Sequence, residues 1–140
     1  MRPWYIHLTL PRDALHRRIA ERVGAMLAAG LVAEVRGLLA GGLEPGAPGL
    51  DGVGYREVIA MLQGELPEAD LPQAIIIATR GYAKRQETWF RHQLRTPDAV
   101  RGAPAILTLD ATEEPALIAA KILERWRMLT AHGALRTAHP

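Results

Sequence analysis

Residues 79–91 gather cationic and aromatic side chains into one short segment, Thr-Arg-Gly-Tyr-Ala-Lys-Arg-Gln-Glu-Thr-Trp-Phe-Arg. Within it stand Lys84, Arg85, Trp89, Phe90 and Arg91. Cations can hold phosphates and flat rings can stack on bases, so this combination is typical of an RNA-binding surface. The segment is therefore the first candidate for a functional site.

Helical geometry divides these side chains between two faces. At 100° per residue, one stripe spanning roughly 60° holds three cations and one acid: Arg80, Lys84, Arg91 and Glu87. An adjacent face holds Arg85, Thr88 and Trp89, beside His92. The alternative is a solvated stripe in which Glu87 pairs with Lys84 or Arg91, and composition alone leaves both open. We also expect at least one of Trp89 and Phe90 to belong to the core.

A second candidate site is residues 51–56, at the start of the helix predicted over 55–62. Its residues combine two glycines with an acid, a ring and a cation: Asp51, Gly52, Val53, Gly54, Tyr55 and Arg56. Glycines let the backbone approach a ligand, and a helix N-terminus attracts anions. Tyr55 could stack on a base and Arg56 could bind a phosphate. The same pattern also fits an ordinary turn into a helix.

The remaining residues supply no complete catalytic set. The chain has no cysteine, no Gly-x-x-x-x-Gly-Lys-Ser/Thr loop and no Gly-x-Ser-x-Gly elbow. None of its five histidines pairs with a carboxylate at metal-ligand spacing. We expect a binding surface, without a metal site built from this chain.

Size and composition indicate one globular domain or a piece of one, with 140 residues and 49% hydrophobic content. A net charge of +2 is too small to establish nucleic-acid binding, so local clusters matter more. Neither a signal peptide nor an apolar run of about 20 residues is visible. We expect a cytoplasmic protein without a membrane partner.

The pattern predicts strands at 5–10 and 105–109. It predicts helices from 12 to Gly30, over 31–40, over 55–62, from 71 to His92 or beyond, and from Thr112 onward. Asp70 with Gln73 is expected to form a capping box, and Thr112 to cap the last helix. Two isolated strands are rarely stable, so we expect them to belong to a larger sheet.

Three blocks of the sequence, in order, resemble the tRNA dimethylallyltransferases, also called tRNA isopentenyltransferases. The first runs from Leu15-His16 to Glu34-Val35. The second is Gly52-Val53-Gly54-Tyr55-Arg56-Glu57-Val58, followed by Leu62-x-Gly64-Glu65. The third is Ala78-Thr79-Arg80-x-Tyr82-Ala83-Lys84-Arg85-Gln86-x-Thr88-Trp89-Phe90-Arg91. The resemblance covers about residues 8–110.

The resemblance implies an α/β, P-loop NTPase-like fold, of which this chain is the mostly helical part with two short strands. It implies transfer of a dimethylallyl group from dimethylallyl diphosphate to N6 of the adenine 3′-adjacent to the anticodon, with the base swung out of its loop. It also implies nucleotide binding at a P-loop, an aspartate base, and Mg²⁺ whose ligands are not in this chain.

Carried over by residue, the resemblance makes Arg80 a diphosphate-contacting, catalytic residue. It makes two segments tRNA-contacting. One is Asp51 to Arg56; the other consists of Lys84, Arg85, Gln86, Glu87, Thr88, Trp89, Phe90 and Arg91. Glu87 stands where the family varies, and its charge could weaken the local grip on phosphate.

The resemblance also predicts that residues 1–129 form the C-terminal portion of such an enzyme, with a disordered tail at 130–140. The P-loop half is expected to be a missing partner, and the chain alone to be inactive. The alternatives are a stand-alone RNA-binding module without catalysis, an isopentenyltransferase acting on free adenine nucleotides, and a purely structural helical domain. The third block argues against the free-nucleotide reading, since a nucleotide offers no RNA backbone to grip.

Overall fold

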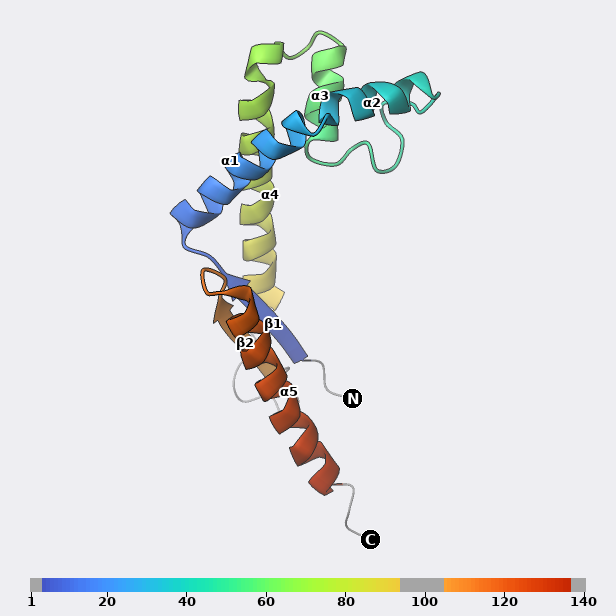
Figure 1. The fold of residues 1–140 in the computed structure, drawn as a ribbon. Helices are drawn as coiled ribbons and strands as arrows, with labels where there is room; N and C mark the ends of the chain where they lie inside the picture. The colour runs from blue at the N-terminus through green and yellow to red at the C-terminus, as the bar shows by residue number, and fades with distance from the viewer. Residues whose placement is uncertain (1–3, 94–104, 137–140) are drawn as a thin grey trace. The chain divides into compact units, whose positions relative to one another are not determined.

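The computed structural model describes residues 4–93 and 105–136, and the chain divides into two compact units (Figure 1). The helical unit, residues 12–93, contains α1 (Arg12–Ala28), α2 (Leu31–Ala40), α3 (Tyr55–Leu62), a 3-10 turn (Glu68–Asp70) and α4 (Leu71–Gln93). The strand unit contains β1 (Trp4–Thr9), β2 (Ala105–Asp110) and α5 (Pro115–Arg136). All the helices and strands expected from the sequence are present.

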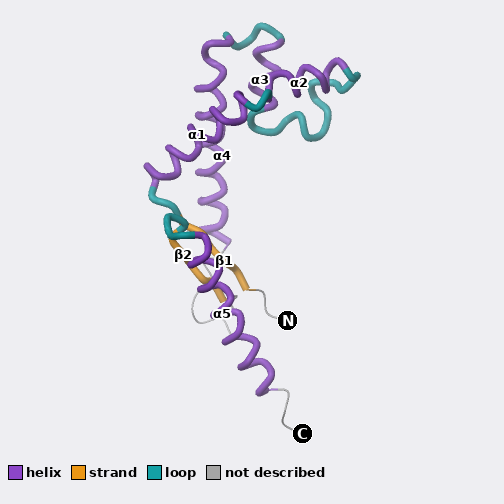
Figure 2. Tube along the Cα trace, viewed as in Figure 1, coloured by secondary structure: helices purple, strands orange, loops and turns teal. Residues whose placement is uncertain are grey.

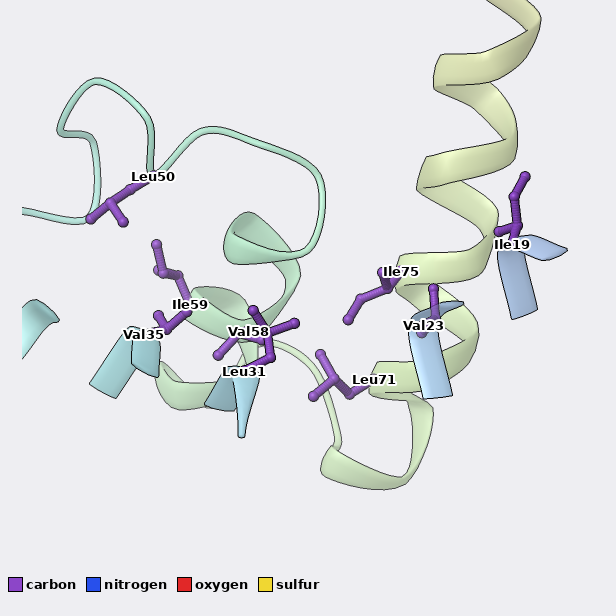
Figure 3. Packing of buried hydrophobic residues seen from close by; sticks show 9 residues of the cluster. All are labelled: Ile19, Val23, Leu31, Val35, Leu50, Val58, Ile59, Leu71 and Ile75. Atoms are coloured by element: carbon purple, nitrogen blue, oxygen red, sulfur yellow. The ribbon is translucent and has the colours of Figure 1, made fainter. Parts of the chain in front are cut away.

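The core of the helical unit forms where α1 and α3 pack against the first half of α4, with α2 against α1 and α3. It consists of nine buried aliphatic side chains: Ile19, Val23, Leu31, Val35, Leu50, Val58, Ile59, Leu71 and Ile75. Figure 3 shows Leu71 and Ile75 pointing from α4 toward the side chains of α2 and α3. Burying each such side chain stabilises the fold by about 1.5–3 kcal/mol before conformational entropy is counted. The two members of this cluster on α4, Leu71 and Ile75, both lie in its first turns.

Glycine separates α1 from α2. Gly30 has a φ of 99°, its N–H donates to the Leu27 carbonyl at 3.1 Å, and its own carbonyl accepts the Glu34 N–H at 2.9 Å. A left-handed residue ends one helix and starts the next, which is the usual role of glycine at a C-terminus.

No single described helix is long and apolar enough to cross a membrane. The pair α1 and α2, bent by 54°, meets that test by length and composition only.

The strand unit is built on one parallel strand pair, in orange in Figure 2. Its register runs from Trp4 opposite Ala105 to Thr9 opposite Asp110. The Trp4 and Trp126 rings lie 5.9 Å apart, so α5 packs against β1. Parallel strands are ordinarily covered on both faces, yet four apolar side chains of this pair are exposed: Tyr5, Ile6, Leu8 and Ile106. A larger sheet and its covering helices would bury these side chains, but the larger sheet stays a prediction.

Both predicted caps are wrong. Asp70 lies inside the 3-10 turn that leads directly into α4, and Pro67 stands at the start of that turn. The Thr112 N–H and hydroxyl both donate to Asp110 Oδ1 at 2.8 Å, three residues before α5 begins at Pro115. These bonds, the one from the Thr112 backbone first, lower the pKa of the Asp110 carboxyl. Proline suits the first helical position because its missing N–H would have no partner there.

The predicted tail at 130–140 also needs correction. Helix α5 continues through Arg136, and residues 137–140 lie outside the described part of the chain. A mostly helical chain with one parallel strand pair is consistent with the α/β class. The P-loop NTPase-like architecture stays a prediction.

Candidate nucleic-acid interface on α4

The second half of α4 lies at the surface. Every residue from Lys84 to His92 is exposed, while Leu71 and Ile75 near its start are buried. Trp89 is 57% exposed and Phe90 39%, so the expectation that one of them belongs to the core is wrong. The two rings pack edge to face instead, with centroids 4.9 Å apart. The physical reason is that the core of the helical unit surrounds only the first turns of α4.

One face of this exposed segment forms an open hollow, here called the α4 face. It is lined by Gly81, Lys84, Arg85, Thr88, Trp89 and His92. A Cβ atom added at Gly81 would lie 3.5 Å from Arg85 Nη1, an ordinary van der Waals contact. The Arg85 guanidinium also lies 5.9 Å from the centre of the Tyr82 ring, a cation–π arrangement. Two cations, a ring and an imidazole thus share one accessible face.

The charges of the two faces differ. Arg91 donates to Glu87 Oε1 at 2.5 Å, so one of the two pairings considered for Glu87 is present. Neither Lys84 nor Arg85 has a carboxylate partner within the described ranges. The Thr88 hydroxyl donates to the Lys84 carbonyl at 2.9 Å and is thereby oriented along the helix. The α4 face is therefore cationic, whereas the charge of Arg91 is already largely matched.

Arg80 lies one turn before the exposed segment and is half-buried. Its Nε is fully buried and has no hydrogen-bond partner among residues 4–93 and 105–136. An unpaired buried donor costs about 1–3 kcal/mol. This N–H therefore has no acceptor in the described structure, and the diphosphate contact of Arg80 stays a prediction.

The loop before α3 is held by a cap. Gly54 is buried with a φ of 100° and a ψ of −54°, and its N–H donates to Glu57 Oε2 at 2.7 Å. Arg56 is exposed and lies 3.6 Å from Glu57. Asp51 is also exposed, whereas Gly52 and Val53 are half-buried. Both charged residues of this segment, Asp51 and Arg56, are therefore accessible to a ligand.

Tyr55 has a structural contact that sequence reasoning missed. Its hydroxyl donates to Glu34 Oε1 at 2.5 Å, and its half-buried ring packs against the core. The hydrogen bond to Glu34 raises the pKa of the tyrosine. The sequence did offer one signal for this contact: Glu34, on the first turn of the preceding helix, carries a carboxylate that can accept a hydrogen bond from a tyrosine hydroxyl. Stacking of Tyr55 on a base stays a prediction.

The structure thus groups Arg85, Thr88 and Trp89 with His92 on one face, as helical geometry predicted. It adds Lys84, which the same geometry had placed on the neighbouring stripe. Glu87 and Arg91 form an ion pair on the neighbouring face. Within the described part of the chain, no group of three or more His, Asp or Glu residues could hold a metal ion. Mg²⁺, whose ligands the family resemblance places outside this chain, stays a prediction.

Comparison with known proteins identifies the family. Residues 1–93 match the family described as IPP transferase. The tRNA dimethylallyltransferase 1 of Trichlorobacter lovleyi is 52% identical over 86 residues, covering 61% of this chain and 28% of that protein. The tRNA dimethylallyltransferase of Opitutus terrae is 50% identical over 107 residues, covering 74% and 34%.

A solved structure agrees with these matches. The full-length tRNA isopentenylpyrophosphate transferase of Bacillus halodurans superposes with a TM-score of 0.79 at 25% identity. The match covers 97% of this chain and 42% of that one. This chain spans about a third of the length of the curated relatives it matches. The chain belongs to the IPP transferase family.

Proposed function

We propose that this chain provides the RNA-contacting part of a tRNA dimethylallyltransferase. The enzyme would transfer a dimethylallyl group from dimethylallyl diphosphate to N6 of the adenine 3′-adjacent to the anticodon, in the cytoplasm. Its support is the family membership and the names of the relatives. The nucleotide-binding P-loop, the aspartate base and the Mg²⁺ ligands would come from residues outside this chain.

The observation that carries the proposal is the α4 face. Lys84 and Arg85 are exposed and unmatched by acids in the described residues, and Trp89 lies beside them with an accessible ring. A strand of RNA needs both features, because cations neutralise phosphates while an aromatic ring takes a base. Lysine acts as a point charge, and arginine can bind a phosphate through two N–H groups.

Arg80 would bind the diphosphate and stabilise its negative charge. Negative charge builds on the leaving diphosphate as the carbon–oxygen bond breaks, so a fixed cation beside it lowers the barrier. The buried Nε of Arg80, which has no partner in the described structure, supports this role, since the donor is already removed from water. The exposed Asp51 and Arg56 would contact the RNA from the loop before α3.

A second candidate is a stand-alone RNA-binding module without catalysis. It is favoured by the same exposed face, which could bind RNA whether or not the chain takes part in a reaction. Both candidates predict RNA binding; only the first predicts that the chain contributes to prenyl transfer when the remainder of such an enzyme is supplied.

The test uses the purified 140-residue chain and a fluorescently labelled anticodon stem-loop RNA. We expect binding that weakens with salt, a salt slope smaller by about one unit in Lys84→Ala, and roughly tenfold weaker binding in Trp89→Ala. Lys121→Ala is the matched control, because Lys121 is paired with Glu113 on the strand unit. Equal binding by all variants would refute the interface.

Prenyl transfer is assayed separately with dimethylallyl diphosphate and the same RNA. We expect no product from this chain alone, and product when a P-loop-containing segment of a relative is added. Product from the chain alone would contradict the assignment of the catalytic groups to other residues. RNA binding without product in either case would favour the stand-alone module.

A further inference from the structure

The carboxylate of Glu57, in the first turn of α3, has two contacts. Its Oε2 accepts the N–H of Gly54 at 2.7 Å, and its Oε1 lies 3.6 Å from Nη2 of Arg56. The Glu57 side chain is 13% exposed, whereas that of Arg56 is 60% exposed. A largely covered carboxylate thus joins the backbone before α3 to the exposed arginine of this segment.

We propose that Glu57 is a positioning residue for RNA binding: its bond to Gly54 fixes the turn from which Arg56 reaches a phosphate of the RNA. The inference rests on the proposed contact between residues 51–56 and RNA. Glu57 touches no phosphate itself, since two negative groups repel each other. It acts through the backbone that carries Arg56.

Backbone donors at the start of α3 are already used within the protein. The Gly54 N–H is bonded to Glu57, and the Arg56 N–H donates to the Gly52 carbonyl at 3.1 Å. A helix N-terminus binds an anion through N–H groups that have no partner, and neither of these two is available. The anion at this helix start is the protein's own carboxylate. This favours the guanidinium of Arg56 as the group that meets a phosphate here.

The ion pair leaves Arg56 able to bind a ligand. Its separation of 3.6 Å from Glu57 exceeds the length of a hydrogen bond between nitrogen and oxygen, about 2.7–3.2 Å. The carboxylate therefore attracts the guanidinium without taking up its N–H donors, of which arginine has several. An exposed ion pair contributes little free energy, so exchanging it for a phosphate contact costs little.

The other end of this arrangement is anchored in the core of the helical unit. Gly54 is buried, and a Cβ atom at its position would lie 3.7 Å from Met26 Cε and 3.8 Å from Leu31 Cδ2. Removal of the Glu57 carboxylate would leave the N–H of this buried residue without its acceptor, which is costly away from water. The turn should then rearrange, and Arg56, two residues later, should move with it.

The experiment measures the affinity of the full chain for the labelled anticodon stem-loop RNA and the dependence of this affinity on salt. Arg56→Ala should bind about two- to fivefold more weakly, with a salt slope smaller by about one unit. Glu57→Ala should show the same two changes. The direction is diagnostic, because removal of a negative charge by itself would tighten binding to RNA. The double variant should bind no more weakly than Arg56→Ala, since the effects of residues that act through each other do not add.

Glu57→Gln tests rescue by a conservative change. Its amide oxygen can still accept the Gly54 N–H, so this variant should retain the affinity that Glu57→Ala loses. Leu39→Ala is the matched control for stability, because Leu39 packs against the core from α2. It should lower the urea midpoint at least as much as Glu57→Ala and still bind RNA as the unmodified chain does. Circular dichroism checks that each variant is folded under the binding conditions.

The outcomes separate this inference from the proposed function. Unchanged or tighter binding by Glu57→Ala would overturn the positioning role, as would additive losses in the double variant. Equal losses in Glu57→Gln and Glu57→Ala, or in Leu39→Ala and Glu57→Ala, would overturn it as well. Unchanged binding by Arg56→Ala would also overturn it, while RNA binding by the α4 face would stand. Absence of binding by the unmodified chain at low salt would overturn both.

Discussion

The Tyr55 hydroxyl donates a hydrogen bond of 2.5 Å to Glu34 Oε1 and thereby joins the start of α3 to the first turn of α2. The two residues are 21 positions apart, and the loop between the helices is rich in glycine and proline. The bond therefore fixes the end of that loop, which is where the exposed Asp51 and Arg56 are presented.

Tyr55→Phe should lower the melting temperature at neutral pH, because Glu34 loses its donor. The hydrogen bond raises the pKa of Tyr55 above its ordinary value of about 10. Its contribution to stability is therefore complete below about pH 10 and is lost as the pH rises through the folded-state pKa. Thermal melts from neutral to strongly alkaline pH should show the difference between the two proteins closing. Tyr82→Phe is the control, since the hydroxyl of this exposed tyrosine has no hydrogen bond in the described structure; an equal effect there would contradict the assignment.

Gly54→Ala should destabilise the helical unit by about 1–3 kcal/mol. The φ of 100° is outside the region that residues with a Cβ readily adopt, whereas the space is sufficient, with Met26 Cε at 3.7 Å and Leu31 Cδ2 at 3.8 Å. Urea unfolding measures the effect. Gly24→Ala in α1 is the matched control; it meets no atom within 4 Å and should stabilise by up to about 1 kcal/mol. Comparable stability of Gly54→Ala and the unmodified chain would mean that this backbone conformation is not required.

Two isoleucines on α4 provide a test of where its core contacts end. Ile75 is 1% exposed and Ile77 is 59% exposed. Ile75→Ala should cost about 2–5 kcal/mol of unfolding free energy through lost burial and a cavity. Ile77→Ala should remain within about 0.5 kcal/mol of the unmodified chain. Equal losses in urea titrations would indicate that Ile77 is covered in solution.

Glu87→Gln should strengthen RNA binding. The change removes a negative charge from the exposed half of α4 and frees Arg91 from its ion pair. The affinity for the anticodon stem-loop should rise by about two- to fivefold at low salt, since exposed charge contacts are individually weak and screened. Glu21→Gln, which removes an exposed carboxylate from α1, should leave binding unchanged. A weaker complex with Glu87→Gln would show instead that the Glu87–Arg91 pair is needed to orient Arg91.

Much of the candidate site could be predicted from local sequence. Helices α2 and α3 have the bounds expected from hydrophobic spacing, because apolar periodicity and flanking glycines are local signals. The grouping of Arg85, Thr88 and Trp89 on one helix face also followed from helical geometry alone. The caps at Asp70 and Thr112 were wrong because each residue had a competing local arrangement, a 3-10 turn in one case and bonds to Asp110 in the other.

By itself, the sequence determined the helices, the family resemblance and the identity of the residues that could contact RNA, since these depend on residue type and spacing along one chain. Only the tertiary structure decided which of them are accessible and unmatched. Whether Trp89 is exposed depends on how far the core extends along α4, and whether Arg91 or Lys84 is unmatched depends on where Glu87 points. Burial and ion pairing are set by contacts between residues distant in sequence and by side-chain conformation, which no local pattern specifies.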